Sequence, residues 1–98
     1  MIEIIKSAII ERLVIQFYYE NKIRIVEPYL LGIHQDTDNL VLVGYLIGGY
    51  SKSQKEPYWR LYDVSKIQSL KAINQRASLN KDGYNPSDKR MKSIICCV

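Results

Sequence analysis

The chain has 98 residues and a formal net charge of +4, with 47% apolar and 24% charged residues. This length allows one domain over residues 1–98, and the composition is typical of a folded globular protein rather than a disordered one. No apolar run reaches 18 residues, and Glu3 and Lys6 interrupt the N-terminal one, so we expect neither a membrane span nor a signal peptide.

The first predicted elements are a helix and two strands. Residues 2–12 predict a short amphipathic helix, because apolar residues recur there at helical spacing. The β-branched and aromatic residues that follow predict strands over 14–19 and 23–33, joined by a tight turn at 20–22. Pro28 lies inside the second strand and indicates an edge, a bulge or a bend, since proline cannot donate to a strand ladder.

The middle of the chain contains its most apolar run. A polar turn over 35–39 precedes residues 40–47, which are apolar on both faces and are therefore expected to form the central strand. Gly44 within this run indicates a sharp bend or the close approach of another backbone. Residues 48–57 are predicted to form a polar loop.

Further strands are predicted over 58–64 and 67–73, followed by a loop over 74–83. Residues 85–88 (Asn-Pro-Ser-Asp) have the composition of a helix start, with Pro86 near the first helical position. We therefore expect a short helix that ends near Lys92, followed by a final strand. The fold class is therefore mainly β (α+β): an N-terminal helix, a small and strongly bent five-stranded β-barrel, and a short C-terminal helix or strand.

Few residues suggest catalysis or metal binding. The adjacent Cys96 and Cys97 rarely bridge each other, and no other cysteine exists, which indicates a reducing, cytoplasmic setting. His34 is the only histidine, and no nucleophile motif or phosphate-cradling glycine loop is present. We therefore expect no enzyme activity, no catalytic residue, no metal and no cofactor.

The positive charge is concentrated toward the C-terminus. Residues 66–98 hold seven Lys or Arg and only two acidic residues, whereas residues 1–65 hold seven and eight. This asymmetry permits an anionic partner, and a solvated basic tail is the alternative interpretation.

Two segments place basic and aromatic side chains in apolar, strand-like sequence: residues 24–29 (Arg-Ile-Val-Glu-Pro-Tyr) and 59–67. Together they resemble the core of the WYL domain, a small regulatory module of bacteria and their phages. Residues 60–67 match the closing pattern of that family position by position, with Tyr62 for Phe and Lys66 for Arg.

The resemblance covers about residues 5–72, and the rest, 74–98, is a loop with a C-terminal extension. Of the Trp-Tyr-Leu triplet that names the family, only Leu42 is present, followed by the matching Tyr45. The length leaves no room for a helix-turn-helix domain beside the barrel, so a stand-alone, divergent member is expected. The family implies an Sm-like barrel that binds single-stranded DNA or RNA or a nucleotide-like effector and acts in transcription regulation.

The predicted ligand-binding residues combine charge with aromatic surface: Arg24, Tyr29, Trp59, Arg60 and Lys66. A guanidinium group recognises phosphate through forked hydrogen bonds, and an aromatic ring can stack on a base. The alternatives also follow from residue type. Arg60 can pair with Glu27 or Asp63, while Tyr29 and Trp59 can be core residues.

A second function fits the same composition. Aromatic residues and arginine are also enriched at protein–protein contacts. The chain is therefore alternatively an interaction module that forms a homo-oligomer or docks on a separate regulator.

Overall fold

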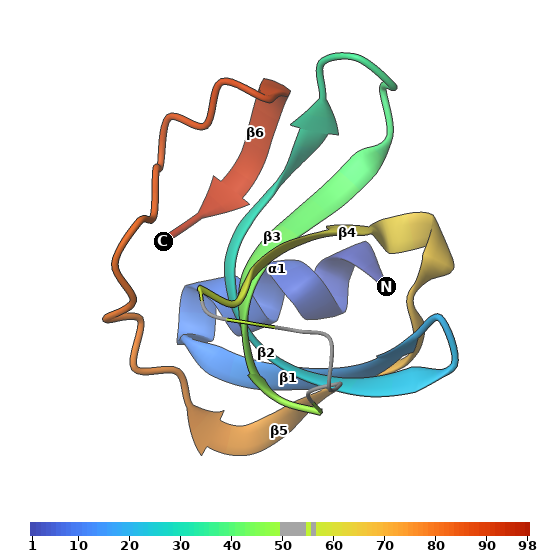
Figure 1. Cartoon of the computed structure of the whole chain (residues 1–98), viewed down its shortest axis with the longest axis vertical. Helices are drawn as coiled ribbons and strands as arrows, with labels where there is room; N and C mark the ends of the chain where they lie inside the picture. Colours follow the sequence, from blue (N-terminus) through green and yellow to red (C-terminus); the bar gives the residue numbers. More distant parts are fainter. Residues whose placement is uncertain (50–54, 56) are drawn as a thin grey trace.

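The computed structural model describes residues 1–49, 55 and 57–98, and most of the loop expected over 48–57 lies outside this part. Helix α1 (Ile2–Glu11) comes first, and the remaining elements are strands and one 3-10 turn (Figure 1). In chain order they are β1 (Leu13–Tyr19), β2 (Lys22–His34), β3 (Leu40–Gly48), β4 (Trp59–Asp63), η1 (Val64–Lys66), β5 (Gln68–Arg76) and β6 (Met91–Cys97).

The strands form one antiparallel sheet in the order β4-β3-β2-β1-β5, with β6 paired to β2. The described strands number six rather than five, and no pairing joins β4 to β5, so the sheet is not closed. The expectation that 40–47 is the central strand was wrong. Strand β2 is the centre, because its 13 residues are long enough to pair with β1 near one end and with β6 near the other.

The pairing of β2 with β3 is irregular where a proline lies opposite a glycine, two residue types that are uncommon inside strands. Pro28 pairs with Gly44, and the register of β2 against β3 shifts between Pro28 and Leu30. A Cβ atom on Gly44 would overlap the Val26 side chain and lie 3.0 Å from the Glu27 carbonyl oxygen. Of the alternatives expected at these positions, the structure shows a bulge at Pro28 and a close backbone approach at Gly44.

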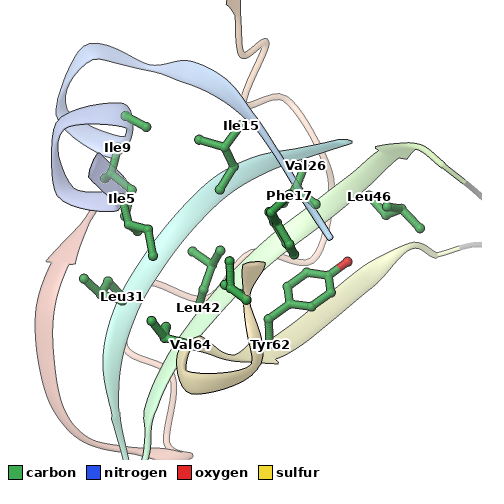
Figure 2. Close-up of a cluster of buried hydrophobic side chains, with 12 residues drawn as sticks. Ile5, Ile9, Ile15, Phe17, Val26, Leu31, Leu42, Leu46, Tyr62 and Val64 are labelled. Atoms are coloured by element: carbon green, nitrogen blue, oxygen red, sulfur yellow. The ribbon is translucent and has the colours of Figure 1, made fainter. Parts of the chain in front are cut away.

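Helix α1 covers the inner side of the bent sheet with Ile5, Ala8 and Ile9, which are buried as their helical spacing predicts. Arg12 ends the helix in the left-handed conformation (φ 59°), and β1 starts at the next residue. The core under the helix joins residues from α1, β1, β2, β3 and β4 (Figure 2). One hydrophobic cluster therefore holds the helix and the sheet together.

The short helix expected after Asn85 does not form, and residues 85–90 make turns instead. The Asn85 side chain accepts a hydrogen bond from the Ser87 amide at 3.0 Å, and Asp88 does the same for the Arg90 amide. These local bonds favour a turn over a helix. The strand expected at the C-terminus does form, as β6, and Figure 1 shows the segment from β5 to β6 running along one side of the molecule.

Candidate functional site

Strand pairing places Arg24, Arg60 and Tyr62 on the inner face of the sheet. Arg24 lies opposite the buried Phe17, and Tyr62 lies opposite the buried Leu42. Residues paired across antiparallel strands project to the same face, and so do residues two apart on one strand. Arg60 therefore shares the face of Tyr62. We call Arg24, Arg60 and Tyr62 the inner basic site.

Arg24 is the deeply buried cation of the inner basic site, with a relative exposure of 6%. Its Nη2 donates to the Tyr19 carbonyl oxygen at 3.3 Å and lies 3.9 Å from a carboxylate oxygen of the exposed Glu20. Its Nε has no hydrogen-bond partner among the residues described. Burying a charge is costly unless it is paired and hydrogen-bonded, so this guanidinium is incompletely satisfied.

Arg60 has only backbone partners in the described part of the chain. Arg60 Nη1 donates hydrogen bonds to the Trp59 carbonyl oxygen at 2.7 Å and to the Pro57 carbonyl oxygen at 3.5 Å. The two carboxylates that the sequence offered as partners are engaged elsewhere. Glu27 binds Lys81, and Asp63 accepts hydrogen bonds from Ser65.

Tyr62 brings a hydroxyl group to the two arginines. Its side chain is 3% exposed, and its ring packs edge-on against Phe17 and Tyr19, each with a centroid separation of 5.0 Å. Figure 2 shows its hydroxyl directed toward the Leu46 end of the core cluster. Within the described residues that hydroxyl has no hydrogen-bond partner.

Burial keeps the Tyr62 hydroxyl protonated at neutral pH. Burial raises the pKa of Tyr62 to about 12, and the charges of Arg24 and Arg60 act against that rise. Both guanidinium groups thus act on the phenol through their charges. At neutral pH the inner basic site offers cations and a neutral hydroxyl donor.

Tyr29 and Trp59 lie away from the inner basic site. Side chains alternate along a strand, so Trp59 projects from the face opposite to Arg60. Trp59 packs on Tyr29 (centroids 4.7 Å apart) and on Tyr45 (5.2 Å), and it lies nearly parallel to Tyr84 at 6.2 Å. We call these four rings the outer aromatic cluster. Tyr29 is buried there as a core residue, the alternative foreseen for it.

Residues 77–83, which we call the strap, cover the outer aromatic cluster. The Trp59 indole Nε1 donates to the Asp82 carbonyl oxygen at 2.7 Å, and the Lys81 amide donates to the Tyr29 hydroxyl at 3.2 Å. Burial raises the pKa of Tyr29. The rings proposed for base stacking are therefore occupied in holding the strap.

Glu27 anchors the strap, and sequence reasoning missed this role. Its carboxylate, on a residue 3% exposed, accepts hydrogen bonds from the Ser78 amide (2.8 Å), the Ser78 hydroxyl (2.9 Å) and Lys81 Nζ (3.2 Å). The signal was present: a lone carboxylate inside an apolar strand needs partners.

A pocket of about 340 Å³ lies beside the strap on the Trp59 side, and its lining includes Arg60 and Leu61. Asp88 and Arg90 form a forked ion pair at its wall, with a shortest N–O distance of 2.6 Å. Hydrogen bonds from Arg90 lower the pKa of Asp88. Because the charges of Asp88 and Arg90 neutralise each other, Arg60 is the unpaired charge among the described residues that line this pocket.

Lys66 is exposed on η1, and no contact joins it to Arg24 or Arg60 in the described structure. Asp63 beside it caps η1, with hydrogen bonds from Ser65 that lower the pKa of Asp63. His34 Nδ1 accepts from the Asp36 amide at 3.1 Å, which is a turn contact. The five predicted residues thus divide into Arg24 with Arg60, Tyr29 with Trp59, and a separate Lys66.

Comparison with known proteins adds no relative. No protein-family model, curated protein or solved structure matches the chain. Within the described residues, no helix is long and apolar enough to cross a membrane. The resemblance to WYL domains stays a prediction.

Proposed function

We propose that the chain is a non-enzymatic regulatory module that binds single-stranded nucleic acid or a nucleotide-like effector through the inner basic site. The observation that carries the proposal is that Arg24 and Arg60 share a sheet face with the buried, unpaired Tyr62 hydroxyl and act on it through their charges. Among the described residues, the exposed Glu20 is the acid near Arg24. An anion would supply the missing charge and hydrogen-bond acceptors.

The WYL resemblance supports the same residues. Arg24 lies in the first matching segment, and Arg60 and Lys66 are the basic positions of the second; the bent sheet behind α1 is compatible with the Sm-like barrel that the family implies. The aromatic part of the proposal changes, because Tyr29 and Trp59 support the strap. Binding then depends mainly on phosphate neutralisation.

Replacing Arg60 with glutamine is expected to weaken binding of a fluorescein-labelled oligothymidylate about tenfold, because one charge-assisted contact is lost. The salt dependence should also become shallower by the equivalent of one phosphate contact. Fluorescence anisotropy at about 50 and about 200 mM salt measures both. Lys89→Gln, an equal charge change on the exposed C-terminal segment, is the matched control.

Lys66→Gln tests whether the third predicted basic residue takes part, and we expect it to behave like Lys89→Gln because Lys66 stands apart from the inner basic site. Equal losses for Arg60→Gln and Lys89→Gln would mean that binding follows net charge rather than this site. Absence of oligonucleotide and nucleotide binding by the unaltered protein would refute the proposed function.

One observation favours the alternative of an interaction module. Large apolar side chains are exposed on α1 and β6: Ile2, Ile4, Ile10, Ile94 and Ile95. Such residues stabilise contacts with a second copy or a separate regulator. If self-assembly is the main role, light scattering after size exclusion will show a dimer that Ile10→Glu converts to monomer; a monomer at every concentration counts against it.

A further inference from the structure

Two hydrogen-bonding atoms of the inner basic site are buried without partners: Arg24 Nε and the Tyr62 hydroxyl oxygen. Buried polar groups in folded proteins are nearly always hydrogen-bonded, and each exception calls for an explanation. The two residues come from β2 and β4 and share the inner face. Two exceptions at one site indicate an acceptor that the described chain does not provide.

The surrounding groups define the chemistry of that acceptor. Guanidinium groups only donate hydrogen bonds, and the Tyr62 hydroxyl has its proton available to donate. Arg24 and Arg60 together bring two positive charges. A phosphomonoester matches this set, because it carries a charge of about −1.5 to −2 at pH 7 and three acceptor oxygens. An internal phosphodiester carries only one negative charge.

Burial favours the same group. The two unpaired atoms have almost no exposed surface, so a phosphate reaches them only if the surrounding side chains move apart, and a small group requires the least movement. An internal phosphodiester has a nucleoside on each side, and both would need room. A terminal phosphate has one substituent only.

We propose that the inner basic site takes a terminal phosphate, on the end of a single-stranded nucleic acid or on a free nucleotide, and that the Tyr62 hydroxyl donates a hydrogen bond to it. This inference rests on the proposed function and narrows its ligand. It also makes Tyr62, which was outside the predicted set, a ligand-contacting residue.

The test combines four ligands with two phenylalanine variants. The ligands are one oligothymidylate with a 5′-phosphate, a 3′-phosphate or no terminal phosphate, and thymidine 5′-monophosphate as competitor. Tyr62→Phe removes the unpaired hydroxyl group. Tyr18→Phe, the control, removes a hydroxyl group from an exposed tyrosine that projects from the face of β1 opposite to the buried Phe17. Urea unfolding checks the fold, and we expect Tyr62→Phe to be no less stable, since the lost hydroxyl has no partner.

The unaltered protein should bind either the 5′-phosphorylated or the 3′-phosphorylated oligothymidylate about tenfold more tightly than the one without a terminal phosphate. A factor of this size is the effect of a hydrogen bond to a charged group. Tyr62→Phe should abolish this preference, and Tyr18→Phe should keep it. Competition by the mononucleotide that depends on Tyr62 would identify free nucleotides as a source of the phosphate. Equal binding of all three oligonucleotides, still dependent on Arg60, would overturn this inference and leave the proposed function intact. Absence of binding by every ligand would overturn both.

Discussion

Replacing Lys81 with methionine is expected to lower the free energy of unfolding by about 1–3 kcal/mol at neutral pH, the cost of taking a hydrogen-bond partner from a buried acceptor. The substitution leaves the Glu27 carboxylate, on a residue 3% exposed, without its cation, whose Nζ lies 3.2 Å away. Ser78 still donates two hydrogen bonds to that carboxylate, which limits the loss. Urea unfolding followed by far-UV circular dichroism measures it.

A second substitution separates charge from packing in this prediction. Adding Glu27→Gln to Lys81→Met removes the uncompensated charge, so the double variant should be more stable than Lys81→Met alone. Lys71→Met on the exposed face of β5 is the matched control and should change stability little. If Lys81→Met and Lys71→Met unfold at the same urea concentration, Glu27 does not depend on Lys81.

The second large effect is expected at Phe17, where alanine should cost about 3–5 kcal/mol, as for other fully buried aromatic residues. Phe17 is completely buried, and its ring contacts those of Tyr19 and Tyr62 edge-on. Removing the ring would leave a cavity beside Arg24, the residue opposite on β2. Urea unfolding again measures the loss.

Tyr18→Ala provides the comparison, because Tyr18 is the next residue on β1 and is 46% exposed on the other face. We expect a loss well below that of Phe17→Ala. A similar loss at both positions would mean that the inner face of β1 is not the core side. Phe17→Leu should retain part of the stability, since leucine fills part of the same space.

Most elements follow from local pattern, whereas their arrangement does not. The helical spacing in α1 and the β-branched and aromatic runs of β1 to β3 are properties of neighbouring residues, and each predicts its own element. The centre of the sheet depends instead on which strands meet. A run of apolar residues signals burial but not the number of partners, so β3 was mistaken for the central strand.

The candidate site was predictable in part for a similar reason. Residue type identified Arg24 and Arg60 as basic residues in apolar strands, but only strand pairing puts them on one face. Trp59 and Arg60 are neighbours on a strand, and alternation alone places their side chains on opposite faces. The sequence was therefore enough to show that the two side chains cannot belong to one binding surface. The roles of Glu27 and Tyr62 depend on residues far away in the chain, and no local pattern contains them.

The position of β6 against β2 has a consequence for how the molecule assembles. Strands β1 and β2 are joined by a turn of two residues, Glu20 and Asn21, so they are close in the sequence. Leu31 on β2 and Cys96 on β6 are paired although most of the chain separates them. Loop-closure entropy opposes such distant contacts, so they form late and slow the folding of β-rich domains. The strap follows β5, and its contacts with Glu27 on β2 and Trp59 on β4 also join residues far apart in the chain, so we expect the strap to be placed late in folding as well.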